Sequence, residues 1–291
     1  MSIDLPAAVA FVEANARLLD RRRAELLLGT GTRHRVVAAL RPYANADGGF
    51  GSALEPDVRG PHSEPTAALA ALEVLAEVGT LDDPATADLV RGVAAWVAGV
   101  AEAGGGVPFV VAATAEHPRG PWMQPTPGGS HLTFGLAGAL HGRDLPWVGV
   151  GTAWCWARLE GAEPLDAYSV KFALDLLDAV SDDHPDAARA DAAVERLRDL
   201  VGAEGTIPVP GGTDGERLHL LDVAPRPRGR SRGLFTADQV AADLDRLEAG
   251  QQDDGGWTFD WLAWSPGQSA EWRGLVTLRA LRVLAAHGRL G

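Results

Sequence analysis

A turn motif that occurs twice with the same internal spacing is the feature of this sequence that most limits its fold. Residues 47–50 read Asp-Gly-Gly-Phe, and residues 254–257 read Asp-Gly-Gly-Trp. Each copy follows an amphipathic, helix-like stretch and precedes a more apolar one, which Glu64 heads in the first copy and Glu271 in the second. Both Asp-to-Glu separations are 17 residues. Units that recur in this way cannot bury their apolar faces alone, so we expect them to stack side by side.

The composition of the helical segments indicates how they stack. The segments headed by Glu64, His131, Asp166 and Glu271 are rich in Ala, Gly and Leu, whereas those before the turns carry more charge. Apolar helices belong inside and charged helices outside. The sequence therefore predicts an all-α protein, an α/α toroid of about five helical hairpins plus one additional N-terminal helix.

The paired glycines predict the backbone of the turn. A glycine after a helix adopts left-handed dihedrals without a Cβ penalty, and a second glycine permits a sharp reversal. We therefore expect left-handed or extended dihedrals at Gly48, Gly49, Gly255 or Gly256. Residues 105–109, Gly-Gly-Val-Pro-Phe, are interpreted as a degenerate further copy.

The rest of the chain is also predicted to be helical, because no segment keeps the period-two alternation of a sheet for long. Residues 203–235, rich in Gly, Pro and Arg, are expected to be the least regular part. Since the composition shows no break, we predict one domain over residues 1–291, with end repeats at 32–79 and 236–288. The predicted helices cover residues 5–28, 32–44, 64–78, 84–103, 130–141, 146–160, 165–180, 185–201, 236–250 and 268–287.

Composition limits the partners and the compartment. The net charge of −13 argues against nucleic-acid binding, which needs a basic surface. No run approaches the ~18 apolar residues of a membrane span, and residues 1–23 lack a signal-peptide pattern. The single cysteine, Cys155, excludes an intrachain disulfide and fits a reducing environment. These features predict a cytoplasmic protein that binds no nucleic acid and does not span a membrane.

The motifs resemble those of a known superfamily. Residues 251–257, Gln-Gln-Asp-Asp-Gly-Gly-Trp, are similar to the QW motif of terpenoid cyclases, and residues 47–50 resemble the turn of protein prenyltransferase β subunits. Members of that superfamily are α/α toroids, so the resemblance implies the same architecture. It also implies an isoprenoid as the ligand.

The catalytic signatures of the superfamily are not found in this chain. Class II cyclases carry an Asp-x-Asp-Asp acid, whereas the nearest tetrapeptide here, residues 243–246, ends in Arg246. Prenyltransferases hold zinc with an Asp-x-Cys element, but Cys155 lies between Trp154 and Trp156 without that Asp. We therefore expect no cofactor and no metal.

One segment matches a metal motif literally. Residues 182–186 read Asp-Asp-His-Pro-Asp, the DDxxD pattern that holds magnesium in class I prenyl synthases when it lies on one helix. Pro185 would interrupt such a helix, and an Asp pair ahead of a Pro-led helix suits its N-terminus. We interpret the segment as the start of a helix.

The carboxylates at the heads of the inner helices are the candidate catalytic groups. Glu64 and Glu271 are expected in the first turns of helices that open at one mouth of the cavity. In an apolar site one carboxyl pKa would rise, so that this residue acts as general acid with His62 as its partner. The alternative is that both Glu residues cap their helices or pair with arginines such as Arg273.

Aromatic and polar side chains near these helix heads are candidates for ligand contacts. Aromatic faces stabilise carbocations by ~0.5–2 kcal/mol for each contact. The alternative is that they pack the repeat, an interpretation that we adopt for Trp96, Trp154, Trp156 and Trp257. The loop with Arg226, Arg228, Arg230 and Arg232 could hold an anion or be a solvated loop. The predicted ligand-contacting residues are His131, Trp122, Trp261, Trp264, Trp272, Arg273 and Tyr168.

Three functions are consistent with these features. The first is a terpenoid-cyclase-like enzyme or isoprenoid-binding protein that acts on an apolar substrate by metal-independent acid–base chemistry. The second is a non-catalytic toroid that binds a hydrophobic ligand or a partner protein. The third is a carbohydrate-active hydrolase or lyase, since α/α toroids also house such enzymes and paired carboxylates suit them.

Overall fold

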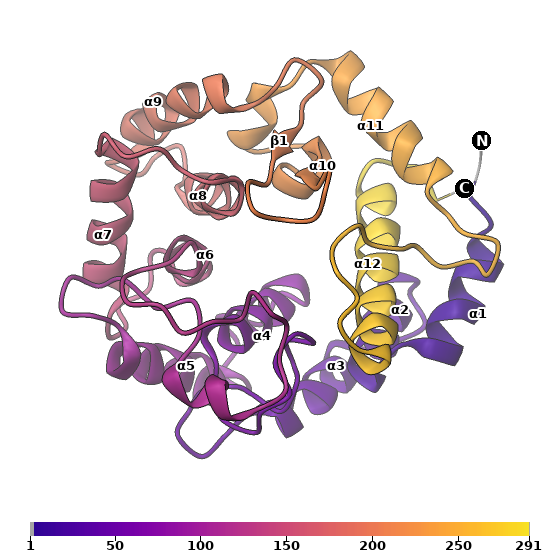
Figure 1. The fold of residues 1–291 in the computed structure, drawn as a ribbon, viewed down its shortest axis with the longest axis horizontal. Coiled ribbons are helices and arrows are strands. Elements are labelled where there is room, and N and C mark those ends of the chain that lie inside the picture. Colours follow the sequence, from indigo (N-terminus) through magenta and orange to yellow (C-terminus); the bar gives the residue numbers. More distant parts are fainter. Residues whose placement is uncertain (1–2, 291) are drawn as a thin grey trace. The chain divides into compact units, whose positions relative to one another are not determined.

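The fold of the protein is all-α. A computed structural model describes residues 3–290, in which the helices α1–α12 are accompanied by one two-stranded sheet (Figure 1). The strands β1 (Ile207–Pro208) and β2 (Arg217–Leu218) are antiparallel, and Ile207 lies opposite Leu218. The chain forms two compact units: unit 1 comprises residues 3–39 and 198–290, and unit 2 comprises residues 40–197.

Unit 1 combines both ends of the chain. Its longest helix, α12 (Pro266–Ala286), packs against α1 (Leu5–Asn15), α2 (Leu18–Leu27) and α11 (Ala237–Ala249). The small helix α10 (Leu220–Val223) packs on α11. The remaining elements of this unit are η3 (Arg198–Leu200), η4 (Ser231–Leu234) and most of α3 (Arg33–Leu40).

Unit 2 is built around three apolar helices. In its centre α6 (Leu132–Ala139) packs against α4 (Pro65–Glu77) and α8 (Ala167–Ala179), and Figure 1 shows α6 and α8 end-on. Nine of the 13 residues of α4 are buried, compared with four of the 11 residues of α9, which supports the predicted division into inner and outer helices. The outer elements are η1 (Arg41–Tyr43), α5 (Ala87–Val100), η2 (Ala112–Glu116), α7 (Val148–Glu160) and α9 (Ala187–Leu197).

The predicted helices are confirmed, with differences at their ends. The segment 5–28 is two helices, because Ala16 and Arg17 adopt extended dihedrals. That break lets Arg17 donate to Asp20, a fully buried carboxylate that also pairs with Arg23. The helix predicted from Pro84 begins at Ala87 instead, after a turn at 84–86.

The repeated turn has the predicted backbone geometry. Gly48 and Gly255 have φ values of +91° and +88°, and Gly105 in the degenerate copy has φ +92°. In each turn the same two backbone hydrogen bonds close the loop. A further copy at residues 202–207, with Gly205 at φ +74°, has the same hydrogen bonds and was not predicted, because its sequence lacks the Gly-Gly pair.

The glycines bring each turn into direct contact with an outer helix. A Cβ on Gly48 would lie 2.8 Å from the carbonyl oxygen of Gly92 in α5. A Cβ on Gly49 would meet the ring of Trp96, which is four residues after Gly92 in the same helix. The other two tight turns repeat this arrangement. Gly105 and Gly106 meet Val150 and Trp154 of α7, and Gly255 and Gly256 meet Ala7 and Phe11 of α1.

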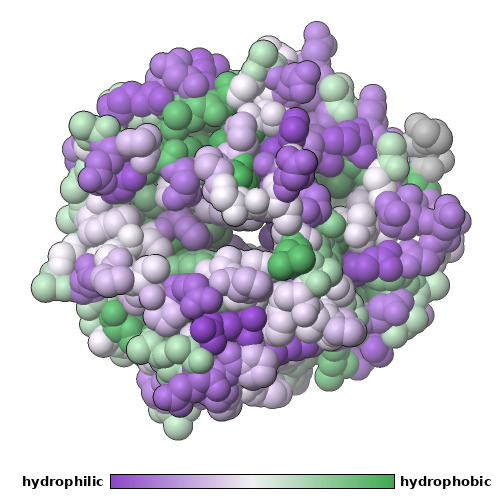
Figure 2. Space-filling view, viewed as in Figure 1, coloured by the Kyte–Doolittle hydropathy of each residue, from purple (hydrophilic) through white to green (hydrophobic). Residues whose placement is uncertain are grey.

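Among residues 3–290, the exposed large apolar side chains are Leu18, Val150, Leu200 and Leu262. On the face shown in Figure 2, hydrophobic residues form small patches among hydrophilic ones. Within residues 3–290, no helix is both long and apolar enough to cross a membrane.

Candidate functional site

The candidate site lies at the head of α4 in unit 2. Glu64, the N-cap residue of α4, has the extended dihedrals φ −128° and ψ 145°. In extended backbone alternate side chains point to opposite sides, so His62 and Glu64 face one way and Ser63 the other. Ser63 donates to Asp47 of the repeated turn at 2.7 Å, which fixes this segment against the turn.

The Glu64 carboxylate is buried and receives three hydrogen bonds. Its Oε1 lies 2.5 Å from Nε2 of His62 and also accepts from the Thr114 hydroxyl, while its Oε2 accepts from the Val111 amide at 3.2 Å. Only 1% of Glu64 is exposed, and this burial raises the pKa of its carboxyl. The three donors satisfy the ionised form and partly offset the effect of burial on the pKa.

His62 is oriented by Glu64 and enclosed by its neighbours. With Nε2 directed at Glu64, the other nitrogen, Nδ1, is buried without a hydrogen-bond partner among the described residues. The His117 ring stacks on His62 with 4.9 Å between the ring centroids. Gly60 allows this approach, since a Cβ there would lie 2.2 Å from Cε1 of His62.

One loop connects the heads of α4 and α6. Val107 donates its amide to Thr133 of α6 at 2.9 Å, and the Phe109 ring packs against His131 at 5.0 Å. Further along, Val111 and Thr114 reach Glu64. Residues 107–114 therefore cover both helix heads.

His131, the N-cap residue of α6, lies among aromatic rings. Besides Phe109 it contacts Tyr168 at 5.6 Å and stacks on Phe172 at 5.5 Å. Burial lowers the pKa of His131 to about 4, so the ring is neutral near pH 7. The structure thus brings His131 and Tyr168 together, as two of the predicted ligand-contacting residues.

The predicted equivalence of Glu64 and Glu271 is wrong. Glu271 is the sixth residue of α12 rather than a helix head, and it is partly exposed. Buried threonines mark the true register, because Thr133 and Thr277 both accept the amide of the residue after the Gly-Gly pair. Counted back two residues from these threonines, the counterpart of His131 is Leu275. The 17-residue spacing therefore does not place Glu271 at the start of a helix, and Glu271 is not assigned as an acid.

The remaining predicted ligand contacts have structural partners. Arg273 of α12 forms a bidentate ion pair with Asp254 at 2.7 and 2.8 Å and lies over the Phe11 ring. It therefore holds the turn at residues 254–257 against α12 and α1. Trp122 packs on a small apolar cluster that includes Val58 and Met123. Trp261 and Trp272 contact each other in unit 1, and Trp264 lies in the same loop as Trp261.

The DDxxD segment does not lie on a helix, which agrees with the prediction that Pro185 interrupts one. Residues 182–186 form a turn before α9, in which Ser181 donates to Asp183 at 2.6 Å. His184 organises the start of α9, since its Nδ1 accepts from the Asp186 amide at 3.1 Å and its carbonyl accepts from the Ala187 amide. Within residues 3–290, no group of three or more His, Cys, Asp or Glu side chains converges on a possible metal position.

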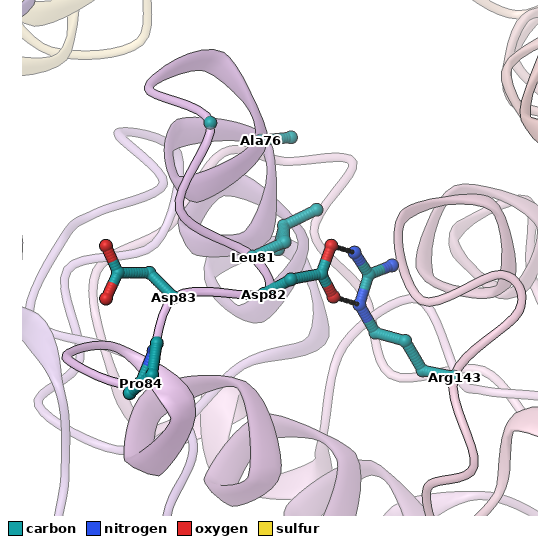
Figure 3. A pocket seen from close by; sticks show the side chains of 7 residues that line it. Ala76, Leu81, Asp82, Asp83, Pro84 and Arg143 are labelled. Carbon is teal, nitrogen blue, oxygen red and sulfur yellow. Dashed lines mark hydrogen bonds and ion pairs between the residues drawn. The ribbon is translucent and has the colours of Figure 1, made fainter.

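Surface hollows of unit 2 include the following pair, neither of which is lined by Glu64. One of about 580 Å³ lies beside the C-terminal end of α4, where Asp82 forms a bidentate pair with Arg143 and Asp83 points away from it (Figure 3). The other, of about 460 Å³, lies behind the loop that covers Glu64. It is lined by Pro108, Val110, Val111, Ala112, Pro125 and Pro127 together with Val100 and Thr126.

Comparisons with known proteins give a structural match alone. No family model matches the sequence, and no curated protein matches it. A crystal structure of a protein from Actinoplanes is similar, with a TM-score of 0.59 and 17% sequence identity over 96% of this chain and 98% of that chain. At this identity the similarity concerns the fold and says nothing about a ligand.

Proposed function

We propose that the protein is an α/α toroid like the terpenoid cyclases and protein prenyltransferases, and that it binds a small apolar, isoprenoid-like molecule in the cytoplasm. His62, oriented by Glu64, performs metal-independent acid–base chemistry on this ligand. The observation that carries the proposal is the pair of His62 and Glu64 at the head of an inner helix. It leaves one buried imidazole nitrogen without a partner.

The hydrogen bonds support one division of roles within this pair. With Glu64 ionised and accepting from Nε2–H of His62, the lone pair of the neutral ring lies on Nδ1, which is then the basic atom. When Nδ1 takes a proton, the Glu64 charge stabilises the imidazolium that forms. A carboxylate whose pKa burial has raised is a stronger acceptor for that N–H. Glu64 is thus a positioning residue and His62 carries the acid–base chemistry. This is the opposite of the sequence-based prediction, in which the glutamate is the general acid and His62 its partner.

The toroid part of the proposal is supported by the succession of turns and outer helices. The first turn packs on α5 and the degenerate copy packs on α7, which are the outer helices that follow them. The last turn packs on α1, the first helix of the chain. A closed ring of repeats requires this last contact.

Mass spectrometry of the organic extract of detergent-free protein tests the function. We expect an isoprenoid in near-stoichiometric amount in the wild type and in the control His34→Asn, which changes an exposed histidine. His62→Asn should retain a different species, because the substrate is no longer converted. The same compound in all three proteins would favour a non-catalytic binding protein, and a bound saccharide would favour the carbohydrate-active alternative. An empty extract would contradict the proposal.

A further inference from the structure

An aromatic cluster in unit 1 contains two indole N–H groups that lack acceptors. The Trp261 and Trp272 rings meet edge to face at 4.9 Å, with 83° between their planes. Phe259 stacks on Trp261 at 4.7 Å. The Nε1 atoms of both tryptophans are buried without a hydrogen-bond partner among the described residues.

Two such donors side by side require an explanation. Buried indole N–H groups usually find a partner, and each unsatisfied donor costs about 1–3 kcal/mol. The face of an aromatic ring is a weak acceptor. However, an edge-to-face pair directs only one edge at one face, so at least one of the two N–H groups is left without even this contact.

The segment that covers the cluster is weakly attached. Residues 258–264, which we term the strap, have no helix or strand. No backbone–backbone hydrogen bond holds residues 258–263 within the described chain. The Thr213 hydroxyl donates to the Asp260 carbonyl at 2.8 Å, and Leu262 on the strap is 47% exposed. The strap is therefore held mainly by its aromatic side chains and can lift at a low cost in free energy.

The charges beside the strap restrict what could enter. Partial burial raises the pKa of the Asp260 carboxyl, and the negative charges of the nearby Glu216 and Asp222 raise it further. An anionic ligand would be repelled there. A hydroxyl group suits both sets of neighbours, because its oxygen accepts a hydrogen bond from an indole N–H while its O–H donates a hydrogen bond to a carboxylate.

We propose that the strap covers a binding site for a neutral, hydroxylated small molecule, which enters when the strap lifts and accepts hydrogen bonds from the indole N–H groups of Trp261 and Trp272. The carbon skeleton of the ligand packs on the aromatic rings of the cluster. A terpenoid alcohol and a saccharide both supply this chemistry. The site is independent of the role proposed for Glu64, because all of its residues belong to unit 1.

The indole signals of the ¹⁵N-labelled full-length protein test this site by NMR. The probes are geraniol, the hydrocarbon myrcene as its matched control without oxygen, and methyl β-D-glucopyranoside. We expect geraniol or the glucoside to move the Trp261 and Trp272 N–H signals downfield, and myrcene to leave them unchanged. The Trp147 and Trp257 signals are internal references, since their N–H groups already donate to carbonyl oxygens at 2.8 and 2.7 Å.

Two variants assign the signals and measure the contribution of each donor. Trp261→Phe and Trp272→Phe keep an aromatic ring and remove the N–H, and each should weaken binding of the active probe about 3- to 10-fold. A response to geraniol alone identifies a terpenoid alcohol, and a response to the glucoside alone identifies a saccharide. No shift with either hydroxylated probe, or an equal shift with myrcene, would overturn the proposal.

Discussion

The contact between the last turn and α1 predicts a large effect of a single methyl group. Gly255→Ala places a Cβ at a residue with φ +88°, where a non-glycine residue costs about 1–2 kcal/mol. The added atom would also lie 2.3 Å from the Ala7 carbonyl oxygen. Backbone must shift to relieve this overlap, at a further ~1–3 kcal/mol. We therefore expect a loss of about 2–5 kcal/mol in the free energy of unfolding.

Gly29→Ala is the matched control in the same unit. Gly29 has φ +75°, but a Cβ there would meet nothing within 4 Å, so only the cost of the dihedral applies. Urea unfolding followed by circular dichroism measures both variants, and the comparison is made at unchanged m values. Equal losses in Gly255→Ala and Gly29→Ala would refute the account of the turn as a close backbone contact.

Further predictions concern buried polar groups. Thr277→Val and Thr133→Val each leave a buried amide without its acceptor, so each should lower the free energy of unfolding in urea by about 1–3 kcal/mol. Thr66→Val is the control and should change it very little, because the Thr66 hydroxyl has no hydrogen-bond partner among the described residues. The raised pKa of Glu64 means that its contribution to stability is full below the unfolded pKa of 4.5 and is lost as pH rises through the folded pKa. The stability of the wild type relative to Glu64→Gln should therefore fall in thermal unfolding as pH is raised above 4.5. The lowered pKa of His131 has the opposite effect on stability. The contribution of the neutral ring to the free energy of unfolding is full above pH 6.5, and up to about 3 kcal/mol of it is lost as pH falls towards 4. His131→Phe should abolish this loss.

Local sequence patterns predicted the helices and the turn geometry, because both depend on neighbouring residues. The Gly-Gly pair fixes φ at Gly48 and Gly255 wherever the turn is placed. The partners of the turn were not predicted. In hindsight the helices α1, α5 and α7 carry a signal, since each presents a contact residue and an aromatic ring four positions later, as Ala7 and Phe11 do in α1.

The candidate site was predicted in part. His62 and Glu64 were identified, because a carboxylate and a histidine two residues apart precede an apolar helix. Their environment was not predicted, since Val111 and Thr114 come from a loop about 50 residues away in sequence. Glu271 was misassigned because equal spacing in sequence does not place it at the start of a helix: α12 begins earlier, at Pro266.

The protonation of His62 is the most direct test of the proposed site. Long-range ¹H–¹⁵N NMR of the histidine rings distinguishes a protonated from an unprotonated nitrogen. In the neutral ring we expect the proton on Nε2, held by Glu64, and the lone pair on Nδ1. Glu64→Leu should remove this preference. A neutral His62 that carries its proton on Nδ1 in the wild type would contradict the assignment of Nδ1 as the base.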